Sequence, residues 1–497
     1  MAISFDQIPT NWRVPLIYAE IDPTQADQAA PAMPYRVLVL GQATATLAPV
    51  LAPQRVTSAA QAVSLFGAGS LLAAQAEAWF GANTTTEVYY VSVPEPEGAK
   101  ATLLVTLTGT ATTGGTISLY IGDDLVSVYV PPSTTAAVAA TALIGAINAH
   151  GGWSAVAGGE AGKLTISAPS KGTVYNGVTV RVGYYQEQAL PEGLSIAYAG
   201  TAPAPASPSP TYKISASLAG LIAFYGNQDP ARPFQSLTIP GILPPLKNGL
   251  AGQLAGGSGV PDLAPLFAAL GDDDWYHFFV SPWTDSATLA ALKEEAERRF
   301  NAMLDKPTHI ICAANGTHAQ LGALGALHNS PHLTILGAGG PFTKQENNLL
   351  LFDGISTYYV NPDGGMTVER LITTYRENAW GAADRAYLDL NTLLTLAYLR
   401  YSYKTWMARI FPRHKLCDDS ANFGVGQAIT TPSIIKGETF AWFQSMEELG
   451  LVENADAFKD ALIVERDPSD VCRVNIKLPP NLVNQLRVMA AKISFRL

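Results

Sequence analysis

Two short stretches of the sequence have residue types and spacings that could bind a metal or a nucleotide. His328 and His332 lie four residues apart, the spacing of two ligands on one helix face, but Pro331 disfavours a helix there. No carboxylate or cysteine nearby completes a set of ligands. The stretch GAGSLLA (67–73) matches the pattern GxGxxA, but it follows a predicted helix, whereas a dinucleotide-binding loop follows a strand. We therefore expect no metal and no cofactor, and we interpret GAGSLLA as a turn between two helices.

A third stretch, NGTHAQLG (315–322), could belong to a hydrolase. It follows the apolar run THIICAA and resembles the histidine motif of subtilisin-like proteases, except that Asn315 stands where the catalytic base would be. A nucleophilic hydrolase needs such a base and a third group that orients it. The sequence has no Gly-Thr-Ser segment to supply the nucleophile. We interpret the stretch as a turn from a strand into a helix, capped by Asn315 or Thr317, and we expect no catalytic residues.

A basic stretch, YLRYSYKTWMARIFPRHKL (398–416), is a stronger signal. Arg400 and Lys404 lie four residues apart and share one face of the predicted helix. A solvated helix face is one interpretation, and a basic surface that meets an acidic protein partner is the other. The net charge of −10 argues against nucleic acid, whose binding proteins carry a basic footprint. The candidate partner-facing residues are Arg400, Lys404, Arg409, Arg413 and Lys415.

The two ends of the chain have the composition of sticky arms. The run LRVMAAKISFRL (486–497) is strand-like, and a free apolar strand needs a partner edge. Residues 471–497 carry five basic side chains and no acidic one, whereas residues 1–30 have one Arg and four acidic side chains. We therefore expect both arms to bind copies of the same chain. Their candidate contact residues are Trp12, Val14, Leu16, Tyr18, Leu486, Val488, Ile493 and Phe495.

The elements that position these residues alternate between strands and helices. The apolar run YRVLVLG (35–41), two helices over 58–65 and 71–80, and EVYYVSV (87–93) form a βαβ-like pattern, which favours an α/β layer with a parallel sheet. Residues 97–200 are rich in period-two runs such as TISLYIG, which is typical of a β-rich insert with one helix at 134–150. The α/β pattern then resumes and includes a helix over 286–305, and a further helix spans 389–410.

These patterns predict a multidomain α/β chain with an α+β C-terminal domain. The domains are an N-terminal arm (1–30), an α/β middle domain (31–96 with 212–370), a β-rich outer insert (97–200), a Pro/Ala/Ser linker (201–211), a C-terminal domain (371–480) and a C-terminal arm (481–497).

The composition points to a surface that is covered by other protein. Charged residues are 14% of the chain, against about 25% in a typical soluble protein. A neutral exterior rich in small residues is the alternative interpretation. The N-terminal sequence lacks the pattern of a signal peptide, and no apolar run is long enough to predict a membrane span. The three cysteines are far apart, which favours buried thiols in a reducing cytoplasm.

Several blocks of sequence, in a fixed order, resemble the contractile tail sheath proteins of Mu-like bacteriophages. The resemblance covers nearly the whole chain, and the blocks containing ITTY and FPRHKL are the most specific. The residues around Cys472 depart from the pattern without affecting a functional position. The blocks are ISFDQIPTNWRVPLIYAEID (3–22), NPDGGMTVERLITTYRENAWG (361–381), YLDLNTLLTLAYLRY (387–401), FPRHKLCDD (411–419), FGVGQAITTP (423–432) and LIVERDPSDVCRVNIKLPPNLVNQLRV (462–488).

The resemblance implies a virion subunit that is assembled in the host cytoplasm. Such subunits polymerise around a tail tube by exchanging strands between their arms, and they contract to drive the tube through the host envelope for genome ejection. The implied partners are copies of the chain, the tail tube protein, and baseplate and tail-terminator proteins, without nucleic acid or membrane insertion. The middle domain would have subtilisin-like topology without protease activity. The alternatives are an α/β hydrolase-like enzyme and another phage structural subunit of the tube or capsid.

Overall fold

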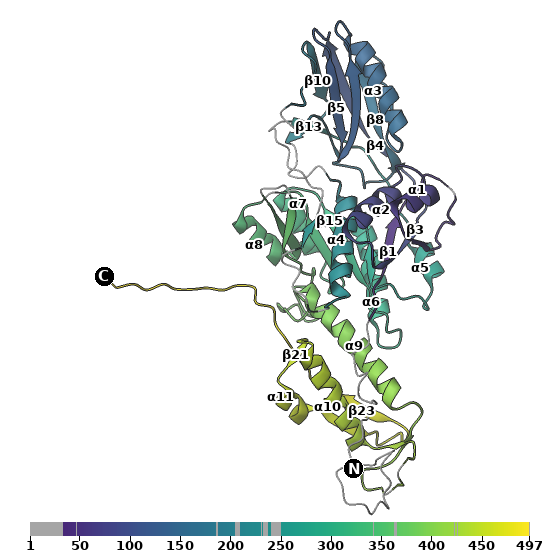
Figure 1. The fold of residues 1–497 in the computed structure, drawn as a ribbon, viewed down its shortest axis with the longest axis vertical. Coiled ribbons are helices and arrows are strands. Elements are labelled where there is room, and N and C mark those ends of the chain that lie inside the picture. The colour runs from purple at the N-terminus through teal and green to yellow at the C-terminus, as the bar shows by residue number, and fades with distance from the viewer. Residues whose placement is uncertain are drawn as a thin grey trace, which may run out of the picture. The chain divides into compact units, whose positions relative to one another are not determined.

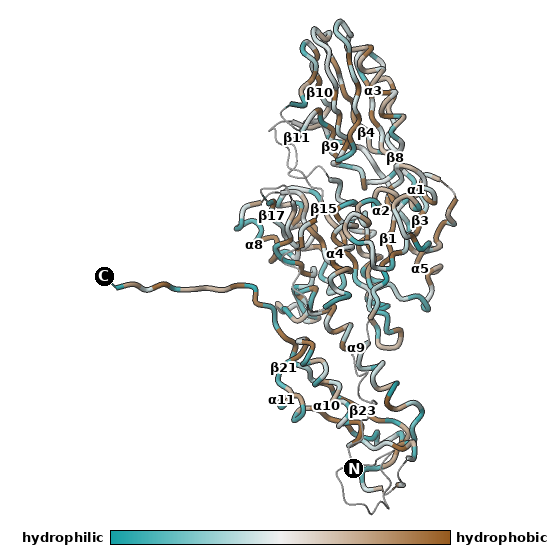
Figure 2. The backbone as a smooth tube through the Cα atoms, viewed as in Figure 1, coloured by the Kyte–Doolittle hydropathy of each residue, from teal (hydrophilic) through white to brown (hydrophobic). Residues whose placement is uncertain are grey.

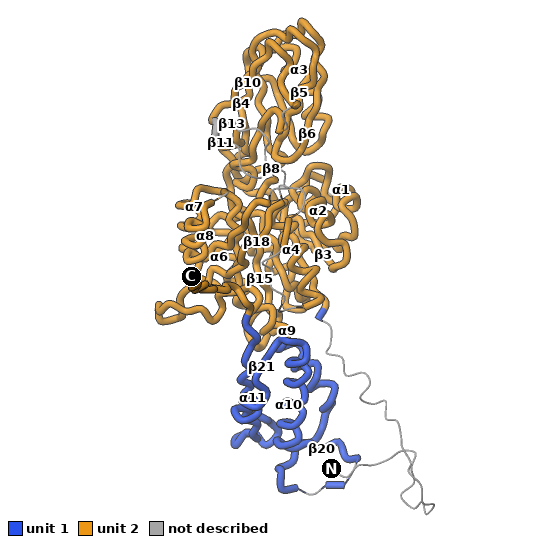
Figure 3. The backbone as a smooth tube through the Cα atoms, turned by 60° about the vertical axis from the view of Figure 1, so that its left-hand side comes forward, with its two compact units in different colours: residues 1–33, 399–484 blue, residues 34–398, 485–497 orange. Residues whose placement is uncertain are grey.

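The computed structural model describes residues 33–45, 47–184, 187–203, 209–229, 231, 237–239, 250–340, 342–361, 365–421, 423–424 and 426–496. The chain forms two compact units, one of residues 34–398 with 485–497 and one of residues 1–33 with 399–484 (Figure 3). The sequence-based domain boundaries differ from these limits and stay a prediction. The expected mixed α/β architecture with several domains is confirmed by the sheets and helices described below (Figure 1).

A nine-stranded sheet forms the centre of the larger unit. Its order is β12-β18-β17-β16-β15-β14-β1-β3-β2, and the strands from β17 to β3 are parallel, as the βαβ pattern predicts. Every residue of β15 is buried, so both faces of the strand are covered and its sequence does not alternate. The strands are β1 (Arg36–Gly41), β2 (Gln54–Val56), β3 (Glu87–Ser92), β12 (Thr238–Ile239), β14 (Phe278–Val280), β15 (His309–Ala314), β16 (Leu333–Gly337), β17 (Ile355–Val360) and β18 (Met366–Arg370).

Five of the seven described helices around this sheet begin at capping side chains that are visible in the sequence, and α4 and α5 do not. The Ser58 side chain accepts a hydrogen bond from Gln61 N at 3.2 Å, and α1 follows it. The helix ends at Gly67, whose φ of 94° favours glycine, and Ser70 caps the next helix, so GAGSLLA is the predicted turn between two helices. The helices are α1 (Ala59–Phe66), α2 (Leu71–Ala82), α4 (Thr211–Gly226), α5 (Ala264–Leu270), α6 (Ser286–Phe300), α7 (His318–Leu327) and α8 (Lys344–Phe352).

Helix α6 is shorter than the sequence predicts. It ends at Phe300, whereas its pattern predicts a helix to residue 305. Asn301 leaves the helix with ψ of 142°, and Asp305 has a φ of 54°, which a helix cannot contain. The sequence favours a longer helix because Ala302, Met303 and Leu304 are good helix formers, but the backbone turns away at Asn301.

The β-rich insert consists of two antiparallel sheets and a helix that packs on both. The strand orders are β10-β4-β8-β7 and β11-β13-β9-β5-β6. Strand β11 lies within the predicted linker, and β13 comes from beyond it, so residues 250–253 return to complete the second sheet. The elements are β4 (Lys100–Gly109), β5 (Gly115–Ile121), β6 (Asp124–Val130), α3 (Ala136–His150), β7 (Ser154–Ala157), β8 (Lys163–Lys171), β9 (Thr179–Val182), β10 (Leu194–Tyr198), β11 (Thr201–Pro203) and β13 (Leu250–Gln253).

The smaller unit is held together by aromatic packing between helices. Helix α9 starts in the larger unit and continues into the smaller one. There Trp442 Nε1 donates to Ser402 Oγ at 3.0 Å, and Phe443 stacks on Phe458 with ring centroids 3.9 Å apart. The elements are α9 (Leu390–Ile410), β19 (Lys415–Leu416), β20 (Ile429–Thr430), α10 (Pro432–Glu448), β21 (Val452–Glu453), α11 (Ala455–Ala461), β22 (Ile463–Arg466), β23 (Val474–Lys477) and β24 (Asn481–Leu482).

Candidate assembly surfaces

The predicted basic surface lies on α9 and the residues that follow it. Lys404, Arg409, Arg413 and Lys415 are exposed, whereas Arg400 is half-buried. Arg409 stacks over the Trp406 ring, with its guanidinium carbon 5.0 Å from the ring centroid. The four exposed cations are therefore placed on the surface of the smaller unit, where a partner could reach them. Whether a partner binds them stays a prediction.

Packing on the opposite side of α9 fixes which residues it exposes. Ser402 and Trp406 are buried, and Tyr403 packs edge-on against Trp442 of α10 with centroids 5.0 Å apart. Tyr403 also shares a hydrogen bond of 3.2 Å with Thr439. Because buried residues of a helix recur every three to four positions, Lys404 and Arg409 are turned outward.

The C-terminal arm is extended and exposed. Residues 483–496 are all described and form no helix or strand, although the sequence is strand-like. Figure 2 shows hydrophobic residues (brown) along this segment. Their exposed fractions are 72% for Leu486, 81% for Val488, 81% for Met489, 89% for Ile493 and 79% for Phe495. The predicted N-terminal contact residues Trp12, Val14, Leu16 and Tyr18 lie outside the described residues.

A short hairpin in the smaller unit has strands that could pair further. β22 and β23 are antiparallel, with Val464 opposite Ile476 and Arg466 opposite Val474. Within the described residues these two strands pair only with each other. Ile463, at the start of β22, is 48% exposed. The outer edge of each strand therefore presents backbone donors and acceptors.

The hydrolase-like stretch is a capped turn, as the sequence predicts. Thr317 begins α7, and its hydroxyl and the Gln320 side chain form a reciprocal capping box. Asn315 lines a crevice of about 30 Å³, on whose other side lie insert residues such as Asn176 and Thr179. That volume holds on the order of a single water, whereas ligand pockets span about 300–1,000 Å³. The geometry beside Asn315 gives no support to the hydrolase alternative.

The two histidines considered as metal ligands lie beyond the end of a helix. His328 follows the last residue of α7, and His332 packs against Phe300 with ring centroids 4.7 Å apart. Burial lowers the pKa of His332 to about 4 and also lowers that of His328. Among the described residues, no group of three His, Cys, Asp or Glu side chains is placed to hold a metal ion.

The described helices also include none that is long and apolar enough to cross a membrane.

A buried lysine joins the insert to the α/β layer, and the sequence analysis missed it. Lys213 of α4 is 9% exposed, and its Nζ lies 2.9 Å from Asp123 Oδ1, 3.2 Å from Glu77 Oε2 and 3.4 Å from Asp124 Oδ1. Asp123 lies in the turn between β5 and β6 of the insert, and Asp124 is the first residue of β6. Burial lowers the pKa of Lys213, but the three carboxylates outweigh it and raise that pKa. A lone lysine in the apolar run TYKISASLAGLIAFYG was the available signal.

A second contact seats the insert on the ends of the parallel strands. Gln42, directly after β1, accepts a hydrogen bond from Ser170 Oγ of β8 at 2.6 Å, and both side chains are buried. Gln42 and Asn315 both follow the carboxyl ends of strands of the central sheet. The insert therefore covers the edge at which α/β sheets usually bind ligands.

Comparison with known proteins shows which family this chain resembles. Residues 382–496 match the phage tail sheath C-terminal domain family. Crystal structures of sheath tail proteins from Desulfitobacterium hafniense and Listeria innocua align at 10% identity, with TM-scores of 0.42 and 0.41. The alignments cover 95% and 93% of this chain, and 97% and 94% of those chains.

A sequence relative covers the whole chain. The Mu-like prophage FluMu tail sheath protein of Haemophilus influenzae is 32% identical over 539 aligned residues, which include 100% of both chains. The sequence blocks that carry the resemblance lie at 3–22 and between 361 and 488. Because this identity extends from end to end, the chain belongs to the family of Mu-like phage tail sheath proteins and is a structural subunit of a phage tail sheath.

Proposed function

We propose that the chain polymerises into a helical sleeve around a tail tube by exchanging strands through its arms. The sleeve then contracts and drives the tube through the host envelope. Subunits fold and assemble into a strained extended lattice, so the energy for contraction is stored without a nucleotide. The finer fold assignment, a middle domain of subtilisin-like topology, is part of the same proposal, and the run of parallel strands from β17 to β3 supports it.

The exposure of the C-terminal arm carries this proposal. Full burial of one large apolar side chain stabilises by about 1.5–3 kcal/mol, so five such side chains in water favour association. The arm is already extended, and an added strand gains backbone hydrogen bonds at an open sheet edge. The hairpin β22–β23 is the candidate acceptor in a neighbouring copy, because its outer edges are unpaired within the described residues.

The sequence of the arm also predicts that, as a strand, it has one side that becomes buried and one side that faces solvent. In a strand, alternate residues point to opposite sides. Met489, Ile493 and Phe495 share one side, whereas Lys492 and Ser494 lie on the other, together with Leu486 and Val488 nearer the root. We infer that, beyond Val488, the first side packs on the acceptor and the second faces solvent.

Partners other than the chain itself are proposed from the family and from charge. The exposed cations Lys404, Arg409, Arg413 and Lys415, with half-buried Arg400, are proposed to face the tube. Baseplate and tail-terminator proteins would cap the two ends of the sleeve, and the insert would form its outer decoration. Each cation contributes little, but repetition along the tube adds the contributions.

Deletion of residues 490–497 tests strand exchange. We expect a folded protein with an unchanged melting temperature that no longer forms sheath-like polymers in negative-stain micrographs. Ile493→Asp with Phe495→Asp should have the same effect, because both side chains belong to the apolar side of the arm. The matched control, Lys492→Gln with Ser494→Asn, changes the other side and should assemble normally. Normal polymers from the truncated chain would exclude strand exchange by this arm.

A further inference from the structure

The root of the C-terminal arm is fastened to the larger unit, although the rest of the arm is exposed. Arg487 Nη2 lies 3.0 Å from Asp389 Oδ1, and the Arg487 side chain is only 18% exposed, whereas the next residue, Val488, is 81% exposed. Gln485 Nε2 donates to the carbonyl oxygen of Ala231 at 2.9 Å. Arg487 Nη2 also donates to Gln485 Oε1 at 2.8 Å, which ties the two root contacts together.

Asp389 is a fixed point of the larger unit. It lies directly before α9, where a negative charge is favourable near a helix N-terminus. Arg370, the last residue of β18, holds the same carboxylate with Nε 3.0 Å from Oδ1 and Nη2 3.2 Å from Oδ2. The backbone is held as well, because Thr373 N donates to the carbonyl oxygen of Leu388 at 2.8 Å. Arg370 and the neighbouring backbone therefore hold the Asp389 carboxylate in place independently of Arg487.

The electrostatics favour a contact that holds but can open. One carboxylate faces two guanidinium groups, so Arg487 is attracted by Asp389 and repelled by Arg370. Burial lowers the pKa of Arg487, Asp389 raises it, and Arg370 lowers it. The guanidinium stays charged at any physiological pH. An ion pair with 18% and 21% exposed side chains is partly screened by water.

We propose that Arg487 and Asp389 form an anchor that sets where the arm leaves the subunit, and that Arg487 thereby positions the arm for capture by a neighbouring copy. The inference rests on the proposed strand exchange. With the anchor closed, the exposed segment is residues 488–496, which reaches at most roughly 30 Å. With the anchor open, the unpaired segment starts after Val483, whose backbone N donates to the carbonyl oxygen of Leu451 at 3.1 Å, and its end samples a larger volume. A shorter, directed arm has the higher effective concentration at its acceptor.

Trypsin cleavage of the full-length chain measures the anchor directly, because trypsin cuts after arginine and lysine. Asp389→Asn removes the partner charge and keeps Arg487 as a cleavage site. At concentrations where the chain is monomeric, we expect cleavage after Arg487 to become about two- to tenfold faster, read by mass spectrometry. Cleavage after Lys492, in the exposed part, should keep its rate and serves as the internal control.

Arg370→Gln is the matched control on the other side of the carboxylate. It removes the competing guanidinium and leaves Asp389 to Arg487, so cleavage after Arg487 should stay constant or slow. Equal acceleration in both variants would indicate general loosening around Asp389 and would overturn the anchor. Gln485→Ala, on the arm side, provides a further variant that leaves the Asp389 environment intact, and it should accelerate the same cleavage.

Assembly assays separate the anchor from strand exchange. Arg487→Gln should raise the concentration needed for polymerisation about two- to tenfold, and Arg487→Lys should restore part of it. If the 490–497 deletion assembles normally, the proposed strand exchange fails, whatever the cleavage result. If the deletion abolishes assembly but Arg487→Gln assembles like the wild type, the positioning role is wrong.

Discussion

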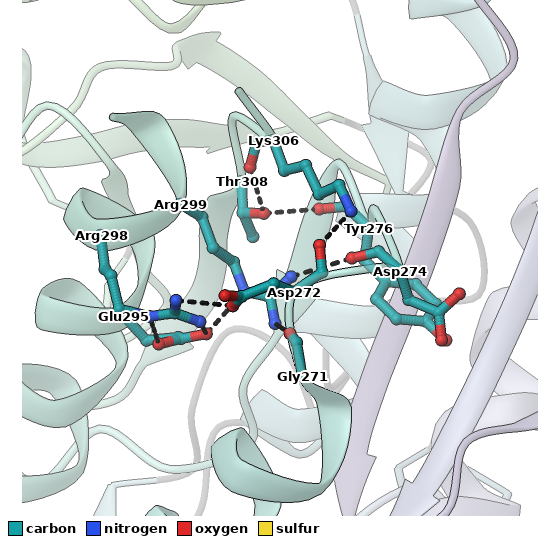
Figure 4. Close-up of polar contacts among 9 residues, drawn as sticks. All are labelled: Gly271, Asp272, Asp274, Tyr276, Glu295, Arg298, Arg299, Lys306 and Thr308. Carbon is teal, nitrogen blue, oxygen red and sulfur yellow. Dashed lines mark hydrogen bonds and ion pairs between the residues drawn. The ribbon is translucent and has the colours of Figure 1, made fainter. Parts of the chain in front are cut away.

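Arg299 and Glu295 lie one helical turn apart on α6, and Arg299 Nε donates to Glu295 Oε1 at 2.6 Å with 0% and 6% of their side chains exposed (Figure 4). The same guanidinium donates to the carbonyl oxygens of Gly271 and Asp274, both at 2.9 Å. One buried cation thus ties the end of α6 to the loop that enters β14. Its hydrogen bonds point in three directions, which suits the planar guanidinium group.

Arg299→Lys should destabilise the larger unit by about 1–3 kcal/mol for each buried acceptor left without a donor, because a lysine keeps the charge but cannot reach all three acceptors. Urea unfolding followed by tryptophan fluorescence measures the loss. The adjacent Arg298 is the matched control, since its side chain is 44% exposed and contacts Glu295 and Asp272. Arg298→Lys should cost about 1 kcal/mol or less. Equal losses at the two positions would contradict this account.

Lys213→Met should weaken the attachment of the insert to the α/β layer. Without the ammonium group, Asp123 and Asp124, whose side chains are each 27% exposed, lose their shared counterion, whereas Glu77 is 70% exposed and stays solvated. We expect a loss of about 3–5 kcal/mol in the free energy of unfolding. Lys163→Met is the control, because Lys163 pairs with Glu160, whose side chain is 74% exposed, and it should cost less than about 1 kcal/mol. A Lys213→Met protein as stable as the control would refute the attachment.

Acid should destabilise the central sheet through its buried histidines. Burial lowers the pKa of His277 to about 3 and of His332 to about 4, and lowers that of His309 well below the usual 6.5. Below pH 6.5 the unfolded chain binds protons that the folded chain does not, so stability falls with pH. Each histidine accounts for a loss of about 2 kcal/mol between pH 7 and pH 5.

His332→Phe isolates one of these contributions. Its aromatic ring can keep the contact with Phe300 but cannot bind a proton. Urea unfolding measures the free energy of unfolding at pH 7 and at pH 5. The loss of this free energy between pH 7 and pH 5 should be about 2 kcal/mol smaller in the variant than in the wild type. An unchanged difference would mean that His332 is protonated in the folded state at pH 5.

Reversal of exposed charges should weaken attachment of the sheath to the tube. We choose Lys404→Glu with Arg413→Glu, because both side chains are exposed, whereas Arg400 is half-buried. An exposed ion pair is worth about 0.2–1 kcal/mol, so the effect comes from repetition along the tube. Tube-free polymers should form normally, but the yield of intact extended tails should fall.

The dependence on ionic strength is a second test of whether these exposed cations face the tube. Association of wild-type sheath with the tube should weaken as ionic strength rises, because salt screens exposed charges. The double variant should lose this dependence. Normal yields of extended tails from the double variant would leave Lys404 and Arg413 as solvated surface residues.

The sequence predicts elements whose signals lie within one segment. The serine before α1, the period-two runs of β5 and β6, and the threonine before α7 each act on residues a few positions away. Such local signals determine where an element begins and which face it buries. The prediction of α6 was five residues too long, because the helix-favouring residues Ala302, Met303 and Leu304 follow Asn301, where the backbone already leaves the helix.

Contacts between distant segments could not be predicted in this way. Lys213 meets side chains 89, 90 and 136 residues away, and Arg487 meets Asp389 across the whole C-terminal region. The sequence showed that the arm is apolar and basic, but nothing in the run LRVMAAKISFRL indicates that its root is held. Pairings of this kind arise from the packing of α4 and of the segment after β18, which local patterns do not encode.

The seating of the insert on the strand ends, through Ser170 and Gln42, has a consequence for how this chain can evolve. An enzyme of similar architecture must keep that edge open, and it diversifies there by changing loops. In this chain a substitution at the same edge would disturb the attachment of the insert. Sequence variation is therefore expected at the opposite end of the insert. The connections at 110–114 and 131–135 lie there, away from the turn that holds Asp123, and most of their residues are exposed and can change, whereas Ala111 is buried and joins the two connections through its hydrogen bond to the carbonyl oxygen of Thr134.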